Sequence, residues 1–328
     1  MSSKFPSPIG GIPYPHDFAP ALVFTILYAL LAPIAAWRMI VKSSRSLVIL
    51  GTVIFTVERI ADFAIRAAEA EKPNIRTTSF FVGWLQNAYG MGYLSMAMDL
   101  GNLARLFVAN ALLSSPATAP SVIPPPPIIP FTGDWEEEQP LTMAGGPRGD
   151  ASSSYSKLPL TEHVPFGDEA HLRVVFKRMK IVMLVLRLTA LFPAITSGSI
   201  FFYGTKSPTI ALIVQLTRYG SALVVLVSQF LVLGLVLWAL QTRPQRTPRK
   251  PALYLLAMIS VVIIPTVYRL AAMRSYTLSL TAMGPGSMNG PTAKALFYTF
   301  HIAPEWISGV MLLAVNVKNM FGVTTTGH

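Results

Sequence analysis

Ionisable side chains interrupt several apolar stretches of the chain, and they are its best candidates for chemistry. The densest group is Glu58, Arg59, Asp62 and Arg66. In a helix, Glu58 and Asp62 lie four residues apart on one face, as do Asp62 and Arg66. Arg59 precedes Asp62 by three residues, so ion pairs within one helix are available. A charge at the centre of a bilayer costs about 2.5 to 3.5 kcal/mol on insertion scales, which makes each such residue a candidate for function.

Six further ionisable residues lie singly in other apolar stretches. They are Asp99, Arg187, Arg218, Arg269, His301 and Glu305. Together with the first group they predict a network that either binds a ligand or fixes helix packing by ion pairs. Arginines outnumber carboxylates among these six, which favours an anionic or phosphate-bearing partner.

Enzymatic chemistry finds no support in the sequence. The chain has no Cys, which removes thiol chemistry and thiolate metal sites. His301 and Glu305 have the i, i+4 spacing of helical metal ligands, but Pro304 distorts that turn and no second pair accompanies them. Retinal would need a lysine within the last stretch, and Lys294 and Lys318 stand only at its edges. We therefore expect no catalytic residue, no metal and no cofactor.

The elements that hold these charges are predicted to be membrane-spanning helices. Only 12% of the residues are charged and 52% are hydrophobic, whereas a soluble domain has about a quarter charged. The mean hydropathy is +0.51. A spanning helix needs about 20 mostly apolar residues. Seven stretches qualify: 18–41, 47–68, 80–108, 175–203, 209–240, 252–273 and 295–317.

We therefore predict an all-α, polytopic membrane protein, a bundle of seven transmembrane helices. Lys and Arg mark cytoplasmic loops. Fourteen of them fall on one side of the seven-helix arrangement and six on the other. This bias predicts that the N-terminus is outside and the C-terminus is cytoplasmic. The first stretch is too long for a signal-peptide core and is expected to be retained. Because four charges interrupt 47–68, a six-helix chain is the alternative.

The stretches divide the chain into five parts. They are a short extracellular N-terminus at 1–17, helices at 18–113, a loop at 114–172, helices at 173–317 and a cytoplasmic tail at 318–328. The loop is rich in Pro, Ser and acidic residues, which predicts disorder. It is either a linker, the reading we favour, or a docking and phosphorylation loop.

The expected partners are membrane lipids, together with a cytoplasmic partner at loops 114–172 and 241–251. The net charge of +11 is explained by orientation in a membrane, so it does not indicate nucleic acid. The topology favours the plasma membrane over an internal one.

With the N-terminus outside, four of the charges fall in the outer half of the bundle: Arg218, Arg269, His301 and Glu305. They predict a site there for an anionic head group. The alternative is that Arg269 and Glu305 pair across two helices and only fix the packing. Pro265 and Pro304 kink the last two stretches and are candidate hinges. Proline is also common in transmembrane helices without such a role.

Three segments resemble fungal seven-helix proteins. They are the stretch from Glu58 to Arg66, the Tyr268-Arg269 pair, and the run containing Phe297 and Tyr298. They are similar to the lipid-translocating exporter-like family and to fungal orphan receptor-like proteins. The resemblance implies a seven-helix bundle and a role in lipid movement or in signalling.

The function expected first is therefore that of an orphan, receptor-like seven-helix protein. It would bind a lipid or amphipathic ligand in its outer half. The alternative is a lipid translocator or stress-linked exporter. A second alternative is a structural membrane protein without a ligand.

Overall fold

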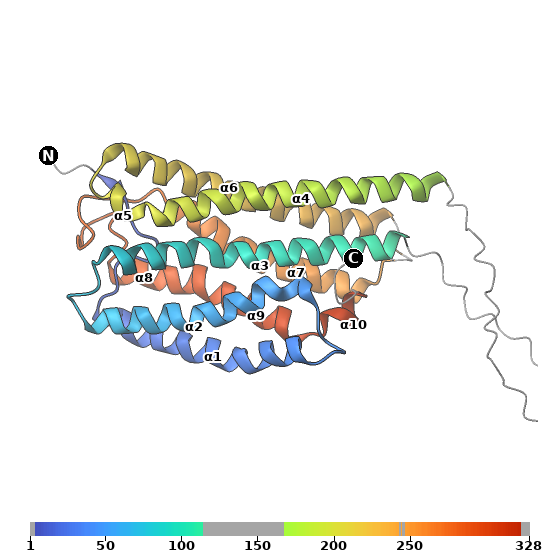
Figure 1. The fold of residues 1–328 in the computed structure, drawn as a ribbon, viewed down its shortest axis with the longest axis horizontal. Coiled ribbons are helices and arrows are strands. Elements are labelled where there is room, and N and C mark those ends of the chain that lie inside the picture. The colour runs from blue at the N-terminus through green and yellow to red at the C-terminus, as the bar shows by residue number, and fades with distance from the viewer. Residues whose placement is uncertain (1–3, 114–166, 243, 245–246, 323–328) are drawn as a thin grey trace, which may run out of the picture.

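The computed structural model describes residues 4–113, 167–242, 244 and 247–322 (Figure 1). Most of them are helical. The long helices are α1 (Phe18–Ile40), α2 (Leu50–Glu71), α3 (Ser79–Leu113), α4 (Gly167–Ser199), α6 (Pro208–Thr242) and α7 (Arg249–Ala272). The last long segment joins α8 (Pro291–Phe297), a π-helical turn (Tyr298–Ile302) and α9 (Ala303–Ala314). Shorter elements are the 3-10 turns Pro15–Asp17 and Leu47–Ile49, and the helices α5 (Phe201–Gly204) and α10 (Val317–Phe321).

Each of the seven apolar stretches is helical in the structure, and the all-α prediction is confirmed. The charged residues of α2 do not break it. Residues 167–172, which were assigned to the disordered loop, instead form the start of α4. The rest of that predicted loop, 114–166, lies outside the described residues.

The helix ends follow ordinary signals. Pro208 and Pro291 are the first residues of α6 and α8, where a missing N–H costs nothing. Asn316 accepts a hydrogen bond from the N–H of Asn319 and so caps α10. Gly322 follows that helix with φ of 64°, a left-handed conformation that glycine adopts readily.

Four helical segments of the described chain are long and apolar enough to cross a membrane. They are Pro15–Ile40, Lys177–Ser199, Pro208–Thr242 and Arg249–Ala272. Large apolar side chains cover their outer faces: Leu30 is 64% exposed, Phe192 63% and Leu216 63%. Apolar surface of this extent requires an apolar solvent. These observations indicate a membrane protein.

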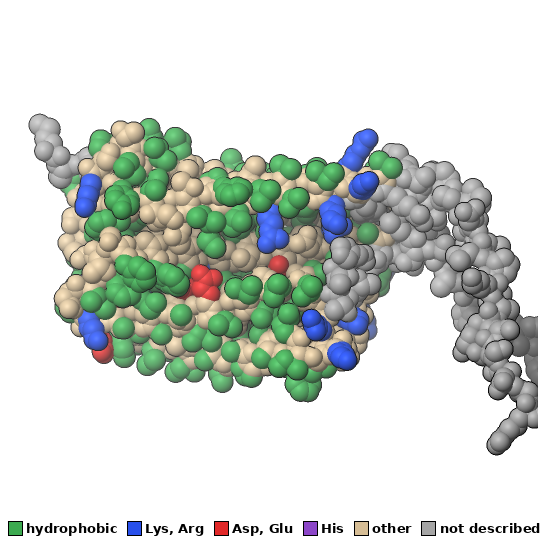
Figure 2. All heavy atoms as spheres, viewed as in Figure 1, with side chains coloured by type: hydrophobic (Ala, Val, Ile, Leu, Met, Phe, Trp, Pro, Cys, Tyr) green, Lys and Arg blue, Asp and Glu red, His purple; other side chains and the backbone are tan. Residues whose placement is uncertain are grey.

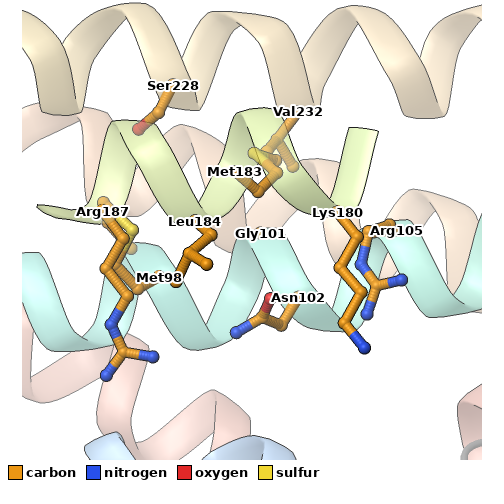
Figure 3. Close-up of a pocket in the computed structure, with 11 residues that line it drawn as sticks. Met98, Gly101, Asn102, Arg105, Lys180, Met183, Leu184, Arg187, Ser228 and Val232 are labelled. Carbon is orange, nitrogen blue, oxygen red and sulfur yellow. The ribbon is translucent and has the colours of Figure 1, made fainter. Parts of the chain in front are cut away.

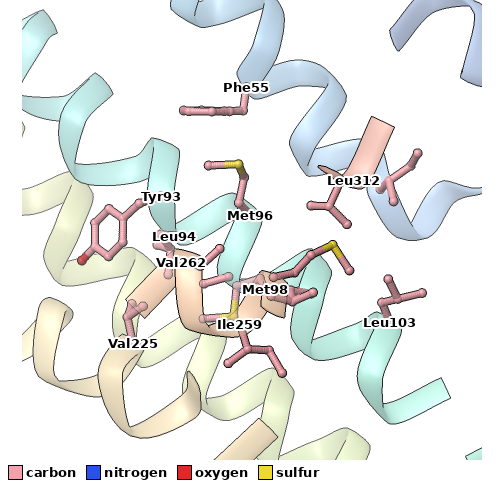
Figure 4. Close-up of a cluster of buried hydrophobic side chains, with 14 of the residues drawn as sticks. Phe55, Tyr93, Leu94, Met96, Met98, Leu103, Val225, Ile259, Val262 and Leu312 are labelled. Atoms are coloured by element: carbon pink, nitrogen blue, oxygen red, sulfur yellow. The ribbon is translucent and has the colours of Figure 1, made fainter. Parts of the chain in front are cut away.

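The long helices lie side by side and alternate in direction along the chain (Figure 1). Helix α3 is central, because it contacts α2, α4, α6 and α7. The core around it combines Phe55 of α2, Met96 of α3, Val225 of α6, Ile259 of α7 and Leu312 of α9 (Figure 4). Segments far apart in the sequence are thereby held in one bundle.

The surface separates charge from apolar residues. In Figure 2, hydrophobic side chains extend along the bundle, and Lys and Arg gather mainly at the end where α10 lies. A few acidic groups appear between the apolar residues, away from either end. A belt of this kind matches a helical bundle that lies in a bilayer.

The opposite end of the bundle is closed by the chain before α1. Strand β1 (Phe5–Pro6) pairs antiparallel with β2 (Tyr276–Thr277), which follows α7. The N–H of Ile12 donates to Asn289 Oδ1 at 2.7 Å. We call residues 4–17 the N-terminal segment.

Candidate functional site

A buried ionic network joins α2 to α9. Arg59 Nη1 lies 3.0 Å from Asp62 Oδ2, and its Nη2 lies 2.8 Å from Glu305 Oε2. All three side chains are fully buried. The indole N–H of Trp84 donates to the other Asp62 oxygen at 2.9 Å. Two carboxylates therefore share one guanidinium inside the bundle, and the i, i+3 pair predicted from the sequence is present.

Glycine on the neighbouring helix makes room for this arginine. A Cβ at Gly92 of α3 would lie 2.3 Å from Arg59 Nη2 and 2.2 Å from the Phe55 ring. The Arg59 guanidinium also stacks over Phe55, at 4.6 Å from the ring centroid. The small residue thus permits the close approach that places the charge against aromatic rings.

Arg66, which lies one helical turn after Asp62 on α2, binds the N-terminal segment. Its Nη2 donates to the Gly10 carbonyl at 2.6 Å and lies 2.9 Å from Asp17 Oδ1. Its Nε donates to the Tyr298 hydroxyl at 2.9 Å. On α8, Lys294 Nζ lies 2.7 Å from Asp17 Oδ2 and donates to the carbonyls of Gly10 and Ile12 at 2.7 and 2.6 Å. Asp17 is therefore held between two cations.

Arg218 of α6 binds the same segment. It donates to the Ser7 carbonyl at 3.1 Å and to Gln86 Oε1 at 3.1 Å. Gln86 in turn exchanges two hydrogen bonds with the backbone of Ile9. Within the described residues Arg218 has no carboxylate within ion-pair distance. Its buried charge is met by neutral oxygens and by the Phe201 ring, whose centroid lies 5.2 Å from the guanidinium carbon.

The N-terminal segment can lie against Phe297 and the two cations because Gly10 adopts a backbone conformation that other residues avoid. Its φ is +74°, and a Cβ there would lie 2.8 Å from the Phe297 ring. Its carbonyl accepts from both Arg66 and Lys294. The described part of the N-terminal segment, predicted from the sequence to be a short extracellular N-terminus at 1–17, lines the network.

Arg269 does not pair with Glu305. The structure does not have the pairing that was the alternative to a ligand site, because Arg59 binds Glu305 and Arg269 donates to the Tyr89 carbonyl of α3. The Arg269 guanidinium lies 4.8 Å from the centroid of the Tyr93 ring.

Next to Arg269 lies a group of buried polar atoms that, within the described residues, lack a hydrogen-bond partner of good geometry. Both ring nitrogens of His301 are among them, as are Glu305 Oε1 and the hydroxyls of Tyr93 and Tyr268. His301 Nε2 lies 3.8 Å from Glu305 Oε1. Buried polar groups are nearly always satisfied, so this cluster is the least satisfied polar part of the core.

Three of the candidate residues lie apart from this network. Asp99 and Arg187 line a groove nearer the other end of the bundle. Glu58 is half-buried on α2, with no hydrogen bond or ion pair in the described part of the chain. The structure therefore brings together Arg59, Asp62, Arg66, Arg218, Arg269, His301 and Glu305, but not the other three.

Several residues of the site were missed from the sequence. Asp17 is the first acidic residue of the chain and stands directly before the first apolar stretch, a signal that could have been used. Lys294 was assigned to the edge of the last stretch but is buried, with 3% of its surface exposed. Gln86 and Tyr298 are polar groups inside helices, and nothing in the sequence alone shows what they contact.

Both candidate hinge prolines lie inside the bundle. Pro265 is buried within α7. Pro304 is the second residue of α9, which follows the π-helical turn directly. A π turn accommodates the hydrogen bond that proline cannot make, and such turns recur at functional sites.

No group of three or more His, Asp or Glu side chains that could hold a metal ion occurs within the described residues. The fold and the site define the class of the protein as an all-helical membrane protein with a buried ionic network. No protein-family model matches the chain, and no similar curated protein or solved structure was found.

Proposed function

We propose that the chain is a seven-span membrane protein with its N-terminus outside and its C-terminus in the cytoplasm. The seven helical segments alternate in direction (Figure 1). The described residues before α1 and after α9 lie at opposite ends of the bundle. The Lys and Arg bias supports the orientation. In this arrangement the buried network lies in the outer half.

We further propose a receptor-like role, in which a lipid or amphipathic ligand binds in that outer half. One observation carries this proposal. Arg66, Lys294 and Arg218 direct their donors at the carbonyls of the N-terminal segment and at Asp17. An anionic head group offers the same oxygen acceptors. It could replace the segment if the segment moves away, because the cations are already positioned.

A disulfide lock tests this exchange. Pro6 and Tyr276 are directly paired across the two strands, and Cα atoms of such antiparallel pairs lie about 4.5 to 5.5 Å apart, within the range of a disulfide. The chain has no Cys, so Pro6→Cys/Tyr276→Cys introduces one possible bond. Binding of fluorescent lysophosphatidic acid to the purified protein is then measured with the lock oxidised and reduced.

Binding that appears on reduction and disappears on oxidation is the expected result. The single variant Tyr276→Cys, which is unable to form the lock within one chain, is the matched control and should bind under both conditions. Equal binding by the locked and unlocked forms would show that the segment does not occupy the ligand site. An absence of binding in every form would favour the structural alternative without a ligand.

A lipid translocator or stress-linked exporter is the second candidate. Glu58 favours it. This residue of α2 is a half-buried carboxyl with no hydrogen bond or ion pair in the described structure, so it does not fix helix packing through a polar contact. The resemblance of 58–66, Tyr268-Arg269 and Phe297-Tyr298 to the fungal exporter-like and orphan receptor-like proteins is compatible with either role. Flip of a fluorescent phospholipid in vesicles that contain the purified chain, lost in Glu58→Ala, would support translocation over reception.

The prolines and the loops enter the same proposal. Pro265 and Pro304 would act as hinges, and the network would transmit the movement of the N-terminal segment toward the cytoplasmic end. The regions 114–172 and 241–251 would contact a cytoplasmic partner there. The plasma membrane is the location that suits an outward-facing ligand site.

A further inference from the structure

A second polar site lies away from the N-terminal segment, nearer the end of the bundle where Lys and Arg gather. It is a groove of ≈ 370 Å³ between the start of α2, the second half of α3 and the middle of α4. Its polar lining consists of Asp99, Asn102, Arg105, Lys180 and Arg187. Three cations and one carboxylate give the lining an excess of positive charge.

The three cations line the same groove and extend to the same side of α3 and α4. In Figure 3, Lys180 and Arg187 of α4 extend alongside Asn102 and Arg105 of α3, on the side of these helices that faces away from α6. Lys180 and Arg187 are seven residues apart, which places them on the same face of α4 two turns apart. Within the described residues none of the three cations forms an ion pair, and the Nε of Arg105 is buried without a partner.

The one carboxylate in the groove is already bound. Asp99 Oδ2 accepts from the backbone N–H of Thr52 at 2.6 Å and from its hydroxyl at 2.9 Å. Thr52 lies in the first turn of α2, where backbone N–H groups lack partners within the helix and the helix dipole favours a negative charge. Asp99 therefore anchors the start of α2, and this single carboxylate does not balance the three cations of the groove.

The groove opens toward the lipid. Its apolar walls include Leu47 and Ile54, whose exposed fractions are 44% and 59%, and Leu184 of α4 is 54% exposed beside it. Arg187 is also exposed and lies near the middle of the candidate span Lys177–Ser199. An exposed, unpaired cation at that depth is costly unless an anion accompanies it or the side chain extends toward the interface.

We propose that this groove binds the phosphate of an anionic phospholipid. Lys180, Arg187 and Arg105 hold the phosphate oxygens, with Asn102 as a further donor. The acyl chains lie against the exposed apolar faces of α2 and α4, on either side of α3. The lipid supplies the counter-charge that the described protein lacks. This site is separate from the outer-half network and does not depend on what binds there.

Lipid titration of the purified full chain in dodecyl maltoside, followed by native mass spectrometry, tests the proposal. Dioleoylphosphatidylglycerol, dioleoylphosphatidylcholine and inorganic phosphate are added separately to wild type. The variant Lys180→Gln/Arg187→Gln removes two exposed cations that contact no protein partner, so it should fold. The control Lys177→Gln/Arg178→Gln removes two exposed cations from the same helix outside the groove lining.

We expect one phosphatidylglycerol to bind wild type and the control with equal affinity, and to bind the groove variant at least about tenfold more weakly, since each charge-assisted hydrogen bond contributes that much. Equal binding of the two lipids would overturn the proposal. An equal loss of phosphatidylglycerol affinity in the control variant would overturn it too, because the positive charge of the surface in general would then explain the binding. Inorganic phosphate binding as tightly as the lipid would refute the lipid as the occupant. A thermal unfolding midpoint equal to that of wild type confirms that the groove variant is folded.

Discussion

Replacing Arg59 by Met removes the cation that lies between two buried carboxylates and keeps most of the side-chain volume. Its guanidinium is 3.0 Å from Asp62 and 2.8 Å from Glu305, and none of the three side chains is exposed. Breaking a buried pair by removing one partner costs about 3 to 5 kcal/mol, because the remaining charge stays buried and unpaired. Asp62 keeps its hydrogen bond from Trp84, so most of the lost folding free energy comes from the Glu305 carboxylate.

The free energy of unfolding of Arg59→Met is therefore expected to fall by about 3 to 5 kcal/mol. Reversible unfolding in mixed micelles of dodecyl sulfate and dodecyl maltoside, followed by helical circular dichroism, measures this change. Adding Glu305→Met to the first variant removes the stranded carboxylate and should recover part of the loss. Arg178→Met, which removes an exposed arginine without an ion pair in the described structure, is the control and should leave stability unchanged.

Two results would refute this reasoning. A stability of Arg59→Met equal to that of the control would show that the network does not hold α2 against α9. Strictly additive losses in Arg59→Met and Glu305→Met would show that these side chains do not interact, since residues in contact couple and distant ones do not.

Three further changes test the N-terminal segment and the start of α2. Gly10→Ala places a Cβ 2.8 Å from an aromatic ring at a φ of +74°, so we expect a lower unfolding midpoint. The control Gly284→Ala, whose added Cβ would have no atom within 4 Å, should leave the midpoint unchanged. Asn289→Ala removes three hydrogen bonds of 2.7 to 2.8 Å and should speed amide exchange in residues 4–17. Thr52→Val removes the 2.9 Å hydroxyl bond to Asp99 and should cost about 1 kcal/mol of unfolding free energy; an unchanged value would contradict this role for the hydroxyl.

The helices could be predicted from the sequence because each carries its own signal. A long apolar stretch forms a helix whatever its neighbours are, since in a bilayer its backbone must satisfy its own hydrogen bonds. This local rule held for α2 despite its charges. It also placed Arg59 and Asp62 on one face, because their spacing is set by the helix itself.

The partners of the network could not be predicted, because they depend on contacts between distant segments. Lys294 reaches the carbonyl of Gly10, which is 284 residues earlier. Whether Glu305 faces Arg59 or Arg269 depends on the rotation of α2, α7 and α9 about their axes, and the apolar pattern of these helices leaves that open. The contacts of the N-terminal segment could not be predicted either, because its partners lie far along the chain.

The positions of the helix connections test the seven-span bundle most directly. The chain has no Cys, so single cysteines at the exposed residues Lys42, Lys72, Lys206 and Lys250 report on their own surroundings. An impermeant maleimide is applied to intact and to permeabilised cells. We predict that Lys72→Cys and Lys206→Cys react in intact cells, and that Lys42→Cys and Lys250→Cys react only after permeabilisation. Reaction of Lys42→Cys and Lys72→Cys under the same conditions would show that α2 does not cross, and would contradict the seven-span account.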